Sequence, residues 1–343
     1  MVKDACKAHC QHTGIRGCNG MKIFTALMIF ILFFTPNFLS AKAFHLFLAG
    51  DTEDAGVGTD IVIDLKNIQE SFTHIAALTN VPLNVYKITS SDKTFTYNHL
   101  KTRFHKAHVA KDDVVIFYYS GHGARSLHTR MIWPCLQFHK RIVDSAKIIK
   151  RLFLKKAALS IVLINACNTF SRRLSGKNID VFQLKRLEGP HVTANLQKLF
   201  FSKCGILIAS AAKPGQAAYG ANPSYVEGQL TEGGSFFTNS FLNILFDMLS
   251  LESPNWETIF KTTKKICHLE HKERHVRPQT PQYAILLGAK KKKVHEYMRH
   301  LSKHCIYGKD AYTLQAPENG IPFDEAYFEM NIEENDSIAE EKK

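Results

Sequence analysis

The sequence lacks a long hydrophobic run, an internal repeat and a stripe of basic and aromatic residues. Its apolar stretch Ile23–Phe34 spans about 12 residues, whereas a helix needs about 20 to cross a hydrocarbon core of ~30 Å. The missing repeat argues against a solenoid or a propeller. Because no basic stripe is interleaved with aromatic residues, we expect no nucleic-acid partner.

The sequence also lacks a standard zinc pattern. Cys6, Cys10 and Cys18 lie near His9 and His12, but their spacing does not match the ligand spacing of known zinc sites. Five cysteines follow residue 43: Cys135, Cys167, Cys204, Cys267 and Cys305. This odd number leaves at least one free thiol in a mature chain that begins there, although export would permit disulfides among the others.

The N-terminal region has the layout of a secretory signal peptide. In residues 21–43, Lys22 precedes the apolar stretch, and the segment ends in the small-x-small pattern Ala41-Lys42-Ala43. We therefore expect a secreted or exported protein. Residues 1–20 form a polar extension, so either the true start is Met21 or the signal has a long first region. The alternative is an uncleaved membrane anchor, which would be the chain's only contact with a membrane.

Charge is distributed unevenly along the chain. Lys and Arg outnumber Asp and Glu by 44 to 31, which gives a net charge of +13. Basic residues crowd between Lys140 and Lys293, whereas the chain after Glu318 is acidic. A basic surplus fits an anionic partner or solubility alone. We interpret residues 289–343 as a charged C-terminal tail.

Apolar segments alternate with helical patterns between residues 44 and 288. The spacing predicts core strands at 44–50, 81–89, 114–119, 161–164, 205–212 and 279–288, an accessory strand within 130–138, and helices at 60–79, 96–109, 143–157 and 233–251. This order predicts an α/β fold with a mostly parallel six-stranded sheet and helices on both faces. Ligands of such sheets bind where the strands end.

Two of the predicted strands end in residues that can act together chemically. His122 stands between two glycines in the segment YYSGHGAR, and Cys167 follows the strand in the segment IVLINACNTF. A cysteine at the end of a strand is usually only a small buried side chain. A histidine at the same edge of a parallel sheet, however, could activate its thiol as a nucleophile. The amides of Gly123 and Cys167 could then donate hydrogen bonds to an oxyanion.

These segments resemble the caspase-like cysteine peptidases, especially metacaspases and their bacterial relatives. SGHG (120–123) and NACN (165–168) are similar to the family's two signature elements. Residues 205–220 resemble the strand and loop that line the primary specificity pocket, and residues 233–242 and 280–283 resemble two later family segments. The resemblance implies a three-layer sandwich in a peptidase domain at 44–288.

The resemblance also implies a catalytic Cys167–His122 dyad that cuts protein or peptide substrates. Cys167 would attack the carbonyl, His122 would protonate the leaving amine, and the Gly123 amide would support the oxyanion. The bond-breaking step would use no metal or organic cofactor. Calcium activates some relatives, and the acidic loop at 51–54 could bind it, although an ordinary solvated loop explains the acidic residues equally simply.

One residue departs from the family pattern. Metacaspase-like members carry Asp two residues before the nucleophile, whereas this chain carries Asn165. An amide pairs more weakly than a carboxylate with a substrate Arg or Lys. We expect Asp51 to supply the charge, with Asp54 as its alternative, and Ser210 to line the same pocket.

Several functions stay open on this sequence. The pocket could prefer a basic residue or a polar one, or it could belong to an inactive module that binds or regulates. A legumain-like peptidase would use an equivalent dyad, and a membrane-anchored adaptor would need none. Residues 171–203 look like an exposed linker, and Arg172-Arg173 or Lys185-Arg186 within it are candidate sites of self-cleavage.

Overall fold

The computed structural model of this chain describes residues 42–125, 132–169, 189, 191–221, 224–226, 229–231, 233–251, 253–273, 278–288 and 297. Almost all of the predicted signal segment and of the C-terminal tail lies outside these ranges, as do the self-cleavage sites. The predictions made for them, and the predicted domain boundaries, stay predictions.

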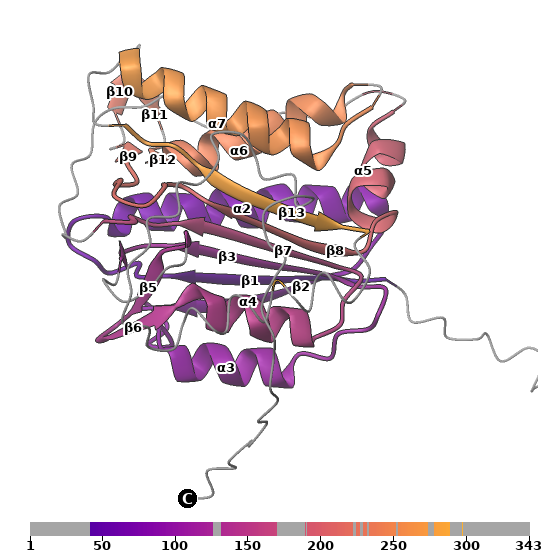
Figure 1. Ribbon diagram of the computed structural model, residues 1–343, viewed down its shortest axis with the longest axis horizontal. Coiled ribbons are helices and arrows are strands. Elements are labelled where there is room, and N and C mark those ends of the chain that lie inside the picture. Colours follow the sequence, from indigo (N-terminus) through magenta and orange to yellow (C-terminus); the bar gives the residue numbers. More distant parts are fainter. Residues whose placement is uncertain are drawn as a thin grey trace, which may run out of the picture. The chain divides into compact units, whose positions relative to one another are not determined.

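Six strands form the central sheet (Figure 1). They are β1 (Phe44–Gly50), β2 (Leu83–Thr89), β3 (Val114–Ser120), β7 (Leu159–Asn165), β8 (Gly205–Ser210) and β13 (Gln282–Leu287). Their order is β13-β8-β7-β3-β1-β2, and every neighbouring pair is parallel except β13 with β8. The predicted mostly parallel six-stranded sheet is confirmed, with β13 as its antiparallel edge.

The central strands are apolar because they are covered on both faces. All seven residues of β1, of β3 and of β7 are buried, as expected for a parallel sheet between two helical layers. The register pairs Gly50 with Ser120, and Ser120 with Asn165. The loops that follow these three strands therefore leave the sheet at one edge.

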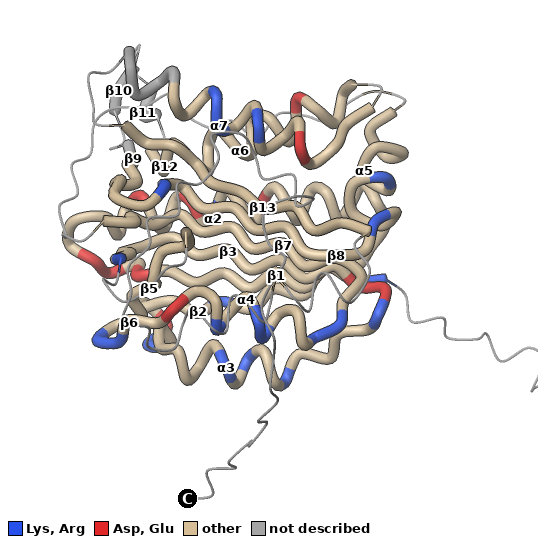
Figure 2. The backbone as a smooth tube through the Cα atoms, viewed as in Figure 1, with Lys and Arg blue, Asp and Glu red and all other residues tan. Residues whose placement is uncertain are grey.

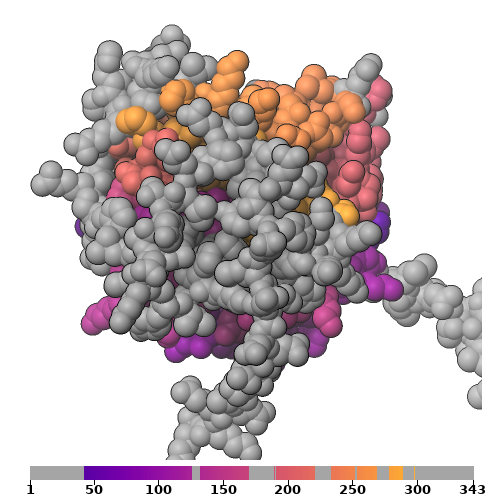
Figure 3. All heavy atoms as spheres, viewed as in Figure 1, coloured from indigo at the N-terminus to yellow at the C-terminus, as the bar shows by residue number. Residues whose placement is uncertain are grey.

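Helices cover both faces of the sheet. One apolar core joins the sheet to α2 (Gly58–Thr79), α5 (Val192–Phe201), α6 (Phe236–Leu249) and α7 (Trp256–Glu273), and the other joins it to α3 (Tyr97–Lys106) and α4 (Ser145–Leu154). In the space-filling view, α7 lies along one side of the visible face and the α3–α4 layer along the opposite side (Figure 3). This is the predicted three-layer arrangement.

Local sequence signals explain where the helices begin. Thr96 caps α3 by accepting a hydrogen bond from the backbone N–H of His99, and Asp144 caps α4 by accepting one from Ala146. Ser235 caps α6 in the same way through Thr238. Such side-chain caps satisfy backbone donors that have no partner within the helix.

Short strands complete the edge where the parallel strands end. β4 (Gly123–Ala124), β5 (Cys135–Phe138) and β6 (Arg141–Asp144) form a small antiparallel sheet. β9 (Gly220–Ala221) pairs with β12 (Gly234–Ser235), and β10 (Ser224–Val226) pairs with β11 (Gln229–Thr231).

Two helices differ from the sequence interpretation. The expected linker does not continue to residue 203, because residues 192–201 form α5 and bury Leu196, Leu199 and Phe200 against the core. The Gly-Pro pair at 189–190 and the surrounding charge favoured a loop, but tertiary packing of three apolar residues outweighs that local preference. No helix was predicted for residues 256–273, where α7 packs on α6.

The α3–α4 layer carries the clearest charge asymmetry. Both helices contain Lys and Arg and neither contains Asp or Glu, and they appear with blue segments in Figure 2. Within the described ranges, no helix is both long and apolar enough to cross a membrane.

Candidate active site

The loops after β3 and β7 meet at the edge of the sheet where the parallel strands end. The backbone N–H of Gly121 donates to the carbonyl of Asn165 over 3.1 Å. A Cβ atom at Gly123 would lie 2.3 Å from the carbonyl oxygen of Cys167 and 3.2 Å from its backbone nitrogen. Only glycine permits this approach, which places the residue after His122 directly against the predicted nucleophile.

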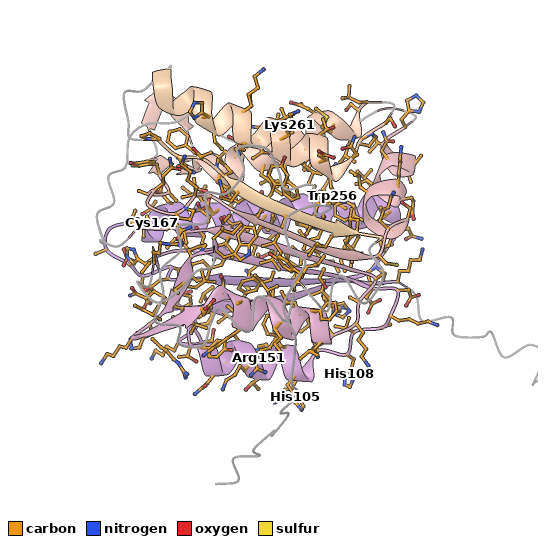
Figure 4. The ribbon with its side chains drawn as sticks, viewed as in Figure 1. His105, His108, Arg151, Cys167, Trp256 and Lys261 are labelled. Carbon is orange, nitrogen blue, oxygen red and sulfur yellow. The ribbon has the colours of Figure 1, made fainter. Side chains whose placement is uncertain are left out.

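Cys167 lies under the loop that follows β8. Its side chain is 6% exposed and is a free thiol, and Figure 4 labels it at the same edge of the sheet. The backbone N–H of Ala218 donates to Sγ over 3.4 Å, and Sγ lies 3.7 Å from the carbonyl oxygen of Ala218. Burial raises the pKa of the Cys167 thiol, and the Ala218 N–H opposes this only in part.

His122 is paired with a carboxylate. Its Nε2 lies 2.8 Å from Oδ2 of Asp54, and both side chains are about one-fifth exposed, at 23% and 22%. The other Asp54 oxygen accepts hydrogen bonds from the backbone N–H groups of Gly56 and Val57, over 2.8 and 3.0 Å. The loop between β1 and α2 therefore holds the imidazole.

Tyr119 packs beneath the histidine. Its hydroxyl lies 2.7 Å from the carbonyl oxygen of His122 and 2.8 Å from that of Gln137. The pKa of Tyr119 is raised, first by burial and then by the nearby charges of Asp51, Cys167 and Asp54, although the Gln137 backbone hydrogen bond lowers it. The acidic loop, the histidine and the cysteine thus gather around one buried ring.

Asn165 is held by a buried acid that the sequence analysis did not select. Its Nδ2 donates to Oδ2 of Asp64 over 2.9 Å and to Oγ of Ser120 over 3.0 Å. Ser120 also donates to the same Asp64 oxygen over 2.7 Å, and the backbone N–H of Ser235 donates to Oδ1 over 2.8 Å. Asp64 is fully buried, and this burial raises its pKa.

A second acid lies one helical turn before Asp64. Asp60 is 9% exposed, and burial followed by the charge of Asp64 raises its pKa to about 7, against the opposing Gly234 amide. A Cβ atom at Gly220 would lie 2.2 Å from Oδ2 of Asp60. Oδ1 of Asp60 and Oδ1 of Asn165 are buried and have no hydrogen-bond partner among the described residues.

The other predicted pocket residues lie at nearby strand ends. Asp51 accepts a hydrogen bond from the Ser90 hydroxyl. Ser210 ends β8, is fully buried and lies 3.4 Å from the carbonyl oxygen of Ala212. No hydrogen bond or ion pair joins either residue to Asn165 within the described part of the chain, and their roles in a pocket stay predictions. The described residues contain no group of three or more His, Cys, Asp or Glu side chains that could hold a metal.

Comparison with known proteins identifies the family. A family model described as "Caspase domain" matches residues 59–303, which is more than half of the chain. The chain belongs to the caspase-domain family. The match extends past residue 288 and includes Tyr297, whose hydroxyl accepts a hydrogen bond from Trp133 Nε1 over 3.1 Å.

One solved structure similar to this caspase-domain chain is Caspase-1 from Spodoptera frugiperda. The identity is 12% and the TM-score is 0.42, over 71% of this chain and 86% of that chain. No curated protein sequence matches. The family assignment therefore rests on the family model, and it makes this chain a caspase-like member of a cysteine peptidase family.

The sequence contained a signal for Asp60 and Asp64, which were not predicted as site residues. Asp60 and Asp64 stand four residues apart, on the helix face that also carries Ile61, Leu65 and Ile68. An acid on the apolar face of an amphipathic helix is unusual, because burial of a charge is costly unless a partner compensates it. These two positions could have been recognised from that conflict.

Proposed function

We propose that the protein is a cysteine endopeptidase whose dyad is Cys167 and His122. The observation that supports this most strongly is the close approach of Gly123 to the backbone of Cys167, because it brings the histidine loop and the nucleophile loop together at one edge of the sheet. An imidazole brought beside a thiol can activate it as a nucleophile.

The proposed reaction proceeds in two steps. Cys167 transfers its proton to His122, and its sulfur bonds to the substrate carbonyl carbon while the Gly123 and Cys167 amides donate to the oxyanion. The peptide C–N bond then breaks as the imidazolium donates its proton to the leaving amine. Water, deprotonated by His122, hydrolyses the resulting thioester and regenerates the thiol.

We further propose that the pocket prefers a basic residue before the cut. Asn165 donates to the buried Asp64, which interacts in turn with Asp60, and no cation neutralises the two acids among the described residues. A substrate Arg or Lys would remove the repulsion between the two carboxylates and would satisfy the unpaired Oδ1 atoms of Asp60 and Asn165. These two acids replace Asp51 as our preferred source of the pocket's charge.

Two single-cysteine variants test the proposed reaction. Cys167→Ala is expected to abolish hydrolysis of short Arg- and Lys-containing peptides by the purified mature chain. Cys204→Ala is the matched control, because Cys204 is an exposed free cysteine remote from the strand ends. Wild-type activity in Cys167→Ala would overturn the dyad, and a positional-scanning peptide library on the wild type would measure the pocket preference.

A binding or regulatory module is the second candidate function. The burial of Cys167 beneath Ala218 favours it, because the thiol is almost fully covered and its raised pKa keeps it neutral. A wild-type chain that binds Arg peptides but hydrolyses no peptide in the library would select this alternative.

Export through the N-terminal segment is also a proposal, supported by the pattern of residues 21–43. N-terminal sequencing of the secreted protein would test it. A mature chain that begins after residue 43 is expected, and an intact N-terminus in a membrane fraction would contradict it.

A further inference from the structure

We propose that Asp54 is a positioning residue that makes the dyad into a carboxylate–histidine–cysteine triad. This inference rests on the proposed peptidase function and assigns the acidic loop a task other than holding calcium or lining the specificity pocket. Its basis is the 2.8 Å contact between Asp54 Oδ2 and His122 Nε2.

The position of Asp54 is fixed by its own loop. Oδ1 accepts the N–H groups of Gly56 and Val57, so the carboxylate closes the turn that leads into α2 and directs Oδ2 at the imidazole. Partial burial alone would raise the pKa of Asp54, but the hydrogen bonds from Gly56 and His122 lower it below its usual range. The carboxylate is therefore ionised at neutral pH.

An ionised carboxylate at Nε2 has two chemical consequences. In the neutral imidazole it keeps the proton on Nε2, so that Nδ1 carries the lone pair that can accept the proton of Cys167. In the imidazolium it stabilises the positive charge that forms when the thiol ionises. Asp54 touches neither the substrate nor the sulfur, and it acts only through the orientation and charge of His122.

The neighbouring acids of the loop differ from Asp54 in their contacts. Asp51 binds the Ser90 hydroxyl, and Glu53 is exposed. Glu53→Gln therefore removes one negative charge from the same loop without touching His122. It provides a control for any general electrostatic effect of the loop.

The test compares Asp54→Asn, Asp54→Ser and Glu53→Gln in the full chain. Asparagine keeps the shape of the side chain, and serine can still cap the Gly56 and Val57 amides while it cannot reach the imidazole. Both Asp54 variants are expected to lower kcat by at least about 10-fold with little change in KM. The acidic limb of the kcat/KM profile should move to lower pH, because His122 must be neutral to accept the thiol proton and its imidazolium loses the carboxylate that stabilises it. Glu53→Gln should change neither quantity.

A second readout does not require turnover. The rate at which iodoacetamide modifies Cys167, followed by peptide mass spectrometry, should fall in both Asp54 variants at pH 7 and stay unchanged in Glu53→Gln. A merely structural role would change thermal stability without shifting the pH profile, and that outcome would overturn the inference.

If Cys167→Ala is inactive while Asp54→Asn has the wild-type profile and alkylation rate, this inference fails and the proposed peptidase stands. If Cys167→Ala retains full activity, the peptidase proposal itself fails.

Discussion

The described part of the chain contains two His–Asp pairs of nearly equal length at opposite ends of the strands. At the end where the strands begin, His45 Nε2 lies 2.9 Å from Asp113 Oδ2, and the side chains are 3% and 4% exposed. At the other end, His122 and Asp54 lie 2.8 Å apart and are several times more exposed. The distance alone does not distinguish a structural pair from a functional one, whereas exposure and surroundings do.

The side chains of the buried pair are occupied by contacts with the surrounding fold. Asp113 also accepts the backbone N–H groups of Ala43 over 2.9 Å and of Ala110 over 2.6 Å. His45 Nδ1 lies 3.3 Å from the Tyr86 hydroxyl. These contacts tie the beginning of β1 to the beginning of β3 and to β2. The histidine of the exposed pair instead lies in the loop that packs against the backbone of Cys167.

The largest difference is expected in activity. His122→Ala should lower kcat/KM by about 10²–10⁴-fold, because it removes the proposed general acid and base, with a small change in stability. His45→Ala should leave kcat/KM of the remaining folded protein close to wild type. Peptide hydrolysis normalised to the folded fraction, measured by circular dichroism, makes the comparison. Equal activity losses in the two variants would contradict this assignment of the pairs.

For stability, the buried pair should matter more than the exposed pair. Asp113→Ala is expected to lower the free energy of unfolding by about 3–5 kcal/mol, because it leaves His45 and two backbone amides buried without their acceptor. Asp54→Ala should cost no more than about 1–2 kcal/mol, because its histidine pair is partly exposed and screened while its turn is lost. Urea unfolding of both variants at pH 7 checks the order, and a larger loss in Asp54→Ala would reverse the comparison.

Asp60 is a buried acid whose raised pKa comes from burial and from Asp64 rather than from a histidine. Its pKa is about 7 in the folded chain and near 3.8 in an unfolded one. Between these values the folded state holds a proton that the unfolded state has lost, so stability should decrease as pH rises from about 4 to 7. The effect is on the order of 2–4 kcal/mol. Asp60→Asn should flatten this slope in urea unfolding across pH 4–8, and an unchanged slope would exclude Asp60 as its source.

The smallest expected effect concerns specificity. Asn165→Asp places a third carboxylate against Asp64, so the empty pocket should become less stable and bind a basic residue better. We expect the kcat/KM ratio of Arg to Asn peptides to rise by up to about 10-fold, which corresponds to about 1.4 kcal/mol. Steady-state kinetics on matched peptides measures this ratio. A decrease would argue against a basic pocket.

The sequence predicted the sheet well because its strands are continuous apolar runs between turns. It also predicted that His122 and Cys167 end two of the parallel strands, since the order of strands and helices determines the edge at which they lie. The partners of these residues were harder to predict. Asn165 and Asp64 are 101 positions apart, and no local pattern indicates that contact. Helix α5 was missed because its stability comes from packing rather than from its own sequence.

Asp64 joins three separate parts of the chain through one carboxylate. Its oxygens accept from Ser120 at the end of the histidine strand, from Asn165 at the end of the cysteine strand, and from Ser235 at the start of α6. A change at this residue would alter the charge of the proposed pocket and the alignment of both strand ends simultaneously. Substrate preference and catalytic alignment are therefore not separate engineering problems in this protein, and a redesign of one must begin by rebuilding the other.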